Sequence, residues 1–320
     1  MLSRRNVRVK VMQLLYAERV DAALTPRLTA AAFSGMVEDS FATLLFELYA
    51  FVHVLREGRA EQKRRGKRLR KTAADDAFRP HVYDNPIVLA LANSPELARA
   101  AASLDFAELL DDERLRGFYD KAKSFDGYED YATTPEPTRD QHLGAVLKAH
   151  KALMDDEGYN DYLEDCFARW EQDKSLVIGA AKKVIKSLPD AALDADGTPS
   201  KPFLYRYETP SETADDFGKH LLDFVLAEDE RLLELIKPVL KNWDAERVAV
   251  LDMVLLKMAL GELLEFPQIP PKVTLNEYVE LAKTYSTDKS KEFVNGVLDA
   301  LLRSLRAEGR IVKEGRGLVE

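Results

Sequence analysis

Apolar and polar positions repeat at helical spacing over most of this chain. In residues 3–20 the apolar residues fall three or four positions apart, which predicts an amphipathic helix with one buried stripe: Val7, Val11, Leu14 and Leu15. The same spacing continues over 27–57 and returns over 141–188, where Gly158 interrupts it. These three stretches are predicted to be helical.

The periodicity is strongest towards the C-terminus. The stretch 212–243 is amphipathic, and Pro238 within it predicts an end or a kink, because proline lacks the backbone donor that a helix needs. Residues 252–264 are apolar nearly all round, which is typical of a helix at the centre of a bundle. Thr274 and Glu277 have the spacing of a capping box, so we expect the next helix to begin directly after Thr274.

The run KEFVNGVLD near the C-terminus contains an Asn-Gly pair, which is typical of a two-residue hairpin turn. The apolar period continues through this pair, from Phe293 to Leu305, and a helix is therefore predicted instead. Gly296 costs about 1 kcal/mol against alanine within a helix. We expect that it stands there because it lets a neighbouring helix approach closely.

No stretch alternates strongly enough to predict a β-sheet, and the best candidate is the short FLYRY at 203–207. Short helical patches separated by Pro, Asn and Asp fill 72–140. Residues 189–202 are rich in Pro, Gly, Asp and Ser, which predicts a loop or linker. The predicted fold class is all-α.

Composition indicates a globular protein with a real core. The chain has 320 residues, of which 46% are hydrophobic and 32% are charged. Cys166 is its single cysteine, so the sequence excludes an intramolecular disulfide and a multi-cysteine zinc site. No stretch approaches the roughly 20 apolar residues that span a membrane, and the N-terminus has no apolar leader. We expect a cytoplasmic protein.

The net charge of −9 hides two basic clusters. The first crowds the start of the predicted N-terminal helix, with Arg4, Arg5, Arg8 and Lys10. The second is KRRGKRLRK at 63–71, in a segment that reads as a turn. A solvated face or mobile loop is the ordinary interpretation of such a run. The first cluster lies beside an apolar stripe on one helix, where its arginines would be held in fixed positions.

The sequence contains no recognisable catalytic or metal-binding pattern. The five histidines form no short-range ligand pair, and none stands beside an obvious nucleophile: His53, His81, His142, His150 and His220. Acidic patches such as MDDEG lie on polar segments, where burial would not shift a carboxyl pKa. We therefore expect a binding protein without a cofactor rather than an enzyme.

Two parts of the chain resemble the NusB family of transcription antitermination proteins. The segment RRNVRVKVMQLLYAERVD resembles its arginine-rich first helix, and the most specific C-terminal pieces are VTLNEYVELAK and FVNGVLD. The resemblance implies an all-α, NusB-like helical bundle made of an N-terminal helix at 1–20 and a C-terminal bundle at 209–308, followed by a tail at 309–320. Residues 21–208 would then be a long, mostly helical insertion, as in long forms of the family resembling those of Bacteroidetes.

The resemblance also implies a function. Members bind the boxA element of ribosomal RNA leader transcripts together with the ribosomal protein NusE, within the RNA polymerase antitermination complex. Carried over position by position, the RNA-binding residues would be Arg4, Arg5, Arg8, Lys283, Tyr285, Lys289 and Phe293. The residues that contact NusE would be Tyr16, Glu246 and Asp252. Asn6, Val9 and Gly261 depart from the family pattern.

Alternatives remain for individual residues and for the whole chain. Tyr285 precedes a polar loop and could stack on an unpaired base, whereas Phe293 fits core packing equally well. For Tyr16 and Asp252, packing and helix capping are equally good interpretations. The chain could instead be a helical scaffold whose middle recruits another factor. An RNA methyltransferase with a NusB-like domain should continue into an α/β domain with a catalytic cysteine, which we do not expect here.

Overall fold

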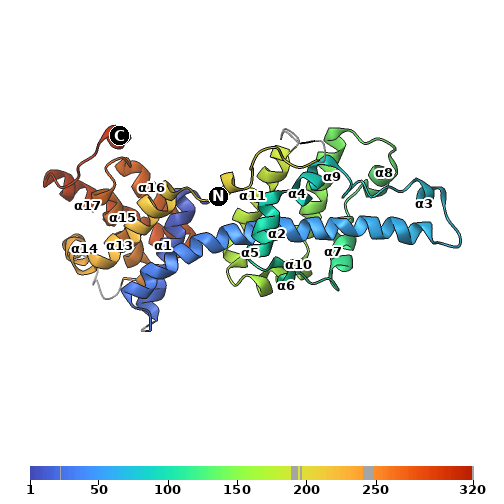
Figure 1. Ribbon diagram of the computed structural model, residues 1–320. Helices are drawn as coiled ribbons and strands as arrows, with labels where there is room; N and C mark the ends of the chain where they lie inside the picture. Colours follow the sequence, from blue (N-terminus) through green and yellow to red (C-terminus); the bar gives the residue numbers. More distant parts are fainter. Residues whose placement is uncertain (22, 189–193, 195–196, 241–247, 319–320) are drawn as a thin grey trace. The chain divides into compact units, whose positions relative to one another are not determined.

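The computed structural model describes residues 1–21, 23–188, 194, 197–240 and 248–318. Regular structure in these ranges is helical, with no β-strand, and the all-α prediction is confirmed (Figure 1). None of the described helices is both long enough and apolar enough to cross a membrane. The chain divides into two compact units. The terminal unit contains Leu2–Val37 and Thr209–Glu320, and the middle unit contains Met1 and Glu38–Glu208.

The terminal unit is a helical bundle around α15 (Val250–Glu265). Every residue of this helix from Val254 to Leu263 is buried, as its nearly all-round apolar sequence predicts. Its neighbours come from both ends of the chain: α1 (Arg4–Val20), α13 (His220–Ala227), α14 (Asp229–Ile236), α16 (Pro271–Tyr285) and α17 (Ser290–Ala307). Between Pro210 and α13 lie the short α12 (Ser211–Thr213) and a π-helical turn (Ala214–Lys219).

Local sequence explains where several of these helices begin and end. The Ser3 hydroxyl accepts a hydrogen bond from the backbone N–H of Asn6 and so caps α1. The helix α14 ends at Ile236 and passes into a 3-10 turn containing Pro238, where the proline was predicted to end or kink the helix. The start of α16 was predicted wrongly. It lies at Pro271, one turn before the predicted position, because proline fits the first turn of a helix well.

Neighbouring helices approach closely at Gly218 but not at Gly296. A Cβ atom at position 218 would overlap the side chains of Val7 and Phe33, which are both buried. Position 296 is helical, as predicted, but it is exposed, and nothing lies within 4 Å of where its Cβ would be. The expected close approach at Gly296 is therefore wrong.

The middle unit is built on α2 (Pro26–Gly66), whose first turns belong to the terminal unit. The weakly patterned region 72–140 forms six short helices: α3 (Ala73–Ala77), α4 (Pro86–Ala92), α5 (Pro95–Ser103), α6 (Phe106–Leu109), α7 (Leu115–Ala122) and α8 (Tyr128–Thr133). Three longer helices follow: α9 (Arg139–Met154), α10 (Glu157–Cys166) and α11 (Trp170–Ser187). They enclose a continuous apolar core that includes Phe51, Tyr119 and Trp170. The middle unit thus has a core of its own.

The basic run at 63–71 is only partly a turn, because α2 continues to Gly66. Arg65 is buried and pairs with Glu61 and Glu129, at nitrogen–oxygen distances of 2.7 and 2.5 Å. Arg68 pairs with Asp75 at 2.6 Å. Two of the run's arginines therefore serve the packing of the middle unit.

Replacing Gly296 with alanine should stabilise the protein by up to about 1 kcal/mol, because the new methyl group restrains the unfolded chain and meets nothing in the folded one. Gly218→Ala is the matched comparison and should destabilise by about 1–3 kcal/mol, since its methyl group would overpack the core. Denaturant unfolding of both variants measures this difference. Destabilisation by Gly296→Ala would show that a close contact exists there after all.

Candidate nucleic-acid interface

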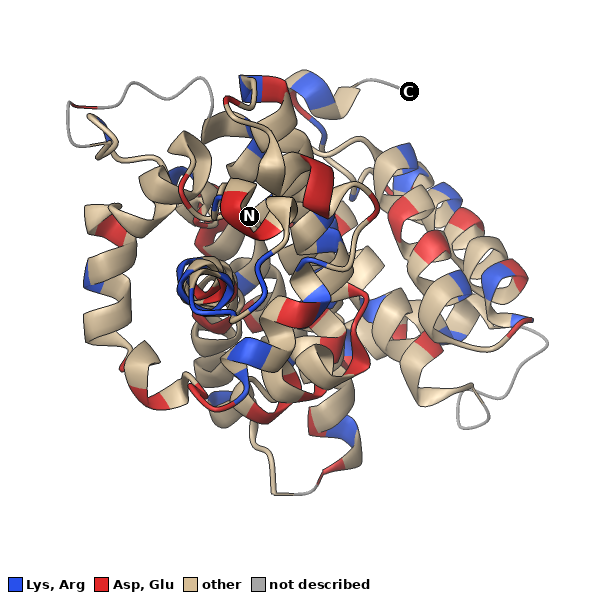
Figure 2. Cartoon of the chain, turned by 90° about the vertical axis from the view of Figure 1, so that its right-hand side faces the viewer, with Lys and Arg blue, Asp and Glu red and all other residues tan. Residues whose placement is uncertain are grey.

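An open pocket lies where the start of α1 meets the connection between α15 and α16. Its volume is about 590 Å³, and its lining combines four arginines with an apolar wall and one acid: Ser3, Arg4, Arg5, Arg8, Gln268, Ile269, Pro270, Val273, Glu277 and Arg316. We call it the arginine pocket. On most helices Lys and Arg are mixed with Asp and Glu (Figure 2). The arginine pocket is therefore a local positive region on a chain whose net charge is −9.

A buried ion pair fixes α1 behind this pocket. Arg8 donates two hydrogen bonds of 2.7 Å to the two carboxylate oxygens of Glu262 on α15. The same carboxylate accepts hydrogen bonds from the hydroxyls of Thr274, at 2.8 Å, and Tyr278, at 3.0 Å, on α16. We call these four residues the Glu262 cluster. One carboxylate thereby connects α15 and α16 to α1, which lies at the other end of the chain.

The environment of the Glu262 cluster keeps Arg8 charged. The Arg8 side chain is 3% exposed and that of Glu262 is fully buried. Burial acts to lower the pKa of Arg8, but hydrogen bonding and attraction to Glu262 outweigh it and raise that pKa above its ordinary value. For Tyr278, burial and then the nearby Glu262 charge raise the pKa of the phenol, which stays protonated and donates.

The structure gives Arg8 a packing role, and its expected contact with RNA stays a prediction. The resemblance implies that Arg8 contacts RNA. Its guanidinium carbon lies 4.9 Å from the ring centre of Phe217, its Nε and one terminal nitrogen donate to Glu262, and its other terminal nitrogen lies 3.5 Å from Glu277. Its side chain therefore positions α1 and does not face solvent. The polar residues of α16 show why its predicted capping box was wrong: Thr274 binds Glu262, and Glu277 binds an arginine of α1.

Arg4 and Arg5 present their guanidinium groups at the surface. Arg5 is 57% exposed and donates to both oxygens of Glu277, at 2.8 and 2.7 Å. The hydrogen bond from Arg5 is the main reason why the pKa of the Glu277 carboxyl lies below its ordinary value. Arg4 is exposed and lies over the ring of Phe217, 5.4 Å from its centre. Both arginines can therefore reach a ligand in the pocket.

The other predicted RNA-binding residues lie at the far end of α16 and in the loop to α17. Lys283, Tyr285 and Lys289 are exposed, and Phe293 is half-buried. Tyr285 follows Glu277 by eight residues, or about 12 Å along the helix axis. The exposed tyrosine thus remains available for stacking, whereas Phe293 contributes partly to packing.

Asp252 does not offer a free carboxylate to a partner. It is buried and accepts hydrogen bonds from the hydroxyls of Ser286, at 2.6 Å, and Ser290, at 2.7 Å. Its side chain holds the loop between α16 and α17, and its expected role as a direct NusE contact stays a prediction. Tyr16 is 41% exposed on α1. Glu246 lies outside the described residues.

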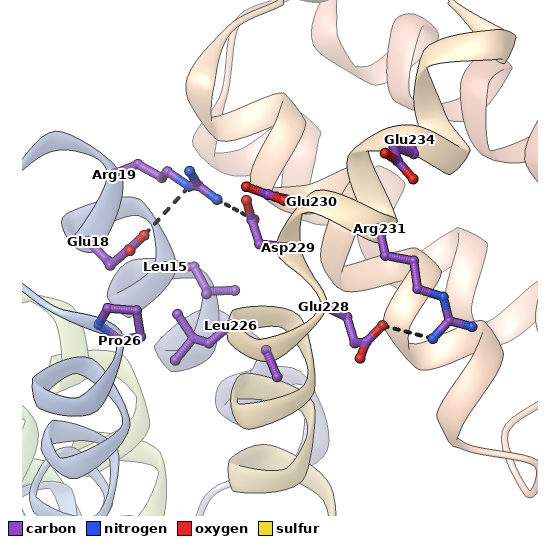
Figure 3. Close-up of a pocket in the computed structure, with 11 residues that line it drawn as sticks. Leu15, Glu18, Arg19, Pro26, Leu226, Glu228, Asp229, Glu230, Arg231 and Glu234 are labelled. Carbon is purple, nitrogen blue, oxygen red and sulfur yellow. Dashed lines mark hydrogen bonds and ion pairs between the residues drawn. The ribbon is translucent and has the colours of Figure 1, made fainter.

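A second pocket, of about 610 Å³, lies beside the end of α1 and the start of α14 (Figure 3). Arg19 pairs there with Asp229, and Lys257 donates to the same carboxylate at 2.5 Å. Burial acts to raise the pKa of Asp229, but these two cations outweigh it and lower that pKa. This cluster was not predicted from the sequence. Lys257, inside the nearly apolar stretch 252–264, was the available signal, because a buried lysine needs an acidic partner.

Comparison with known proteins matches the C-terminal part of the chain to one family. The profile described as the NusB family matches residues 178–303. A transcription antitermination protein NusB of Salinibacter ruber is 42% identical over 144 residues, which cover 44% of this chain and 89% of the relative. The NusB protein of Chloroherpeton thalassium is 36% identical over 37% of this chain and 64% of the relative. The NusB protein of Oleidesulfovibrio alaskensis is 36% identical over 28% of this chain and 59% of the relative. No solved structure gives a significant match.

Replacing Arg8 with alanine should lower the free energy of unfolding by about 3–5 kcal/mol, because Glu262 would stay buried without its counter-charge. Arg5→Ala removes an arginine pair of the same two-pronged geometry from the surface and should cost about 1 kcal/mol or less. Chemical denaturation of the two variants measures the contrast. Equal losses would show that the buried pair does not hold the terminal unit together.

Proposed function

The chain belongs to the NusB family, and on this premise we propose that it is a transcription antitermination factor that binds boxA RNA of ribosomal leader transcripts together with the ribosomal protein NusE. It would act in the cytoplasm as part of an RNA polymerase antitermination complex. The observation that carries the proposal is the arginine pocket, where exposed Arg4 and Arg5 stand on a helix fixed from behind by the Glu262 cluster.

The chemistry of the pocket suits a nucleic acid strand. Arginine donates two parallel hydrogen bonds to phosphate oxygens, and its charge does not titrate at physiological pH. The apolar wall formed by Ile269, Pro270 and Val273 offers a surface for an unpaired base beside those phosphates. Single-stranded RNA exposes both groups at once. The pocket therefore favours a single strand over a duplex, whose bases are turned inward.

The exposed end of α16 would extend this surface. Tyr285 supplies an aromatic face for stacking, and Lys283 and Lys289 supply cations on either side of the loop. Asp252 contributes indirectly, because its hydrogen bonds to Ser286 and Ser290 fix the loop. Phe293 would support the loop through packing and present only part of its ring.

We place the NusE contact along the later turns of α1. Tyr16 is exposed there, and Arg19 lies one turn further on, beside the second pocket. Several charged groups line that pocket, including Glu18, Glu228 and Arg231. An exposed tyrosine next to a rim of charges is a common composition for a protein interface. Glu246 remains a proposed contact from the family resemblance alone.

The double replacement of Arg4 and Arg5 with alanine should weaken boxA RNA binding at least tenfold, since two charge-assisted phosphate contacts are lost. The slope of log K against log salt concentration should fall by about 1.4, at about 0.7 for each phosphate contact on a single strand. Fluorescence anisotropy at several salt concentrations measures both quantities.

The matched control removes two arginines from the basic run of the middle unit, as Arg64→Ala with Arg70→Ala, and should leave binding within about twofold of the unaltered protein. Repeating each titration with NusE present should tighten RNA binding, because two ligands of one complex favour each other reciprocally. If the control double variant lost as much affinity as the first, RNA would be bound through general charge and not in the arginine pocket.

A further inference from the structure

The C-terminal tail packs back onto the connection between α15 and α16. The Lys313 ammonium group donates to the carbonyl of Phe266 at 2.9 Å. The backbone N–H of Glu314 donates to the carbonyl of Pro267 at 3.0 Å. We call residues 310–318 the tail strap. Its two anchors lie on the segment that also forms one wall of the arginine pocket.

Two glycines allow the tail strap to lie this close. Gly317 is buried, and a Cβ atom there would overlap the carbonyl oxygen of Pro267. Gly315 has a φ of +51°, in the left-handed region that favours glycine, and its Cβ would meet the Gln268 side chain at 2.7 Å. The sequence Gly-Arg-Gly is therefore required by the path of the backbone and places the residue between the glycines.

That residue is Arg316, which lines the arginine pocket together with Arg4 and Arg5. It is exposed, and the structure records no ion pair for it within the described ranges. Arg5 is paired with Glu277 and Arg8 with Glu262, so their charges are largely compensated. The uncompensated positive charge of the pocket comes from Arg4 and Arg316, on opposite ends of the chain.

We propose that Arg316 is a further RNA-binding residue, which the tail strap holds in the arginine pocket to bind a phosphate of a single-stranded RNA. This inference rests on the proposed function of the same pocket and adds a contact that the first helix does not supply. Arginines that reach a phosphate from two elements can neutralise it from two sides. The neighbouring wall of Ile269, Pro270 and Val273 leaves room for the attached base.

The experiment compares three single variants by anisotropy titration with a boxA RNA oligonucleotide at several salt concentrations. Arg316→Ala should weaken binding about tenfold and lower the salt slope by about 0.7. Gly317→Ala keeps the arginine but displaces the tail strap, and it should produce a similar loss. Arg303→Ala removes one exposed arginine from α17 and should stay within about twofold of the unaltered protein.

The variants separate the inference from the proposed function on which it rests. If Arg4→Ala with Arg5→Ala abolished binding while Arg316→Ala kept full affinity and slope, the inference would be overturned and the proposed function would stand. If neither the double arginine variant nor Arg316→Ala changed binding, the inference and the proposed function would both fail. Full binding by Gly317→Ala, or a loss by Arg303→Ala equal to that of Arg316→Ala, would also overturn the role of the strap. Deletion of 310–320 should reproduce the Arg316→Ala loss, and full binding by the shortened chain would overturn the role of the strap.

Discussion

The carboxylate of Glu262 is the interaction on which the terminal unit depends. It is fully buried, and removing such a charge from water costs several kcal/mol unless partners compensate. Four hydrogen bonds do so: two from Arg8 and one each from Thr274 and Tyr278. Because those partners lie on α1 and α16, the cost is recovered only when both helices dock on α15. The ion pair therefore specifies an arrangement of helices that apolar packing alone would leave freer.

This constraint organises the surface as well as the core. With α1 fixed by Arg8, the preceding turn must carry Arg4 and Arg5 to the rim of the pocket. Asp252, near the other end of α15, fixes the loop that follows α16 in the same way, through Ser286 and Ser290. Two buried acids on one central helix thus position the two parts of the proposed RNA surface. Protein groups that are already in place lose less conformational entropy when a ligand binds.

Much of this could be predicted from the sequence, because apolar periodicity is a local signal. It located α1, α15 and α17, and it showed that the Asn-Gly pair lies within a helix. Tertiary roles of polar residues were predicted less well. Thr274 and Glu277 have the spacing of a local cap, but their side chains serve Glu262 and Arg5, which lie on other helices. From the sequence alone, Arg8 could not be distinguished from Arg4 and Arg5, because its buried acidic partner is seen only in the structure.

The other features that the sequence did not predict also depend on tertiary contacts. Gly296 and Gly218 cannot be distinguished by local pattern, since only the packed structure shows which one faces another helix. The tail strap likewise depends on contacts of Gly317 with a segment some 50 positions earlier, which helical periodicity does not report. Acidic residues inside an apolar helix, such as Glu262, are the signal that could have been used. A buried acid requires a basic or hydroxyl partner, and the basic cluster at the N-terminus was available.

The most direct measurement is photo-crosslinking of the protein to a boxA RNA that carries 4-thiouridine, followed by identification of the crosslinked peptides. We predict crosslinks in the peptides that contain Arg4 and Arg5, Tyr285 and Arg316, all of which belong to the terminal unit. Crosslinks confined to the basic run at 63–71, or spread evenly over the middle unit, would contradict the claim that the arginine pocket held in place by Glu262 is where RNA binds.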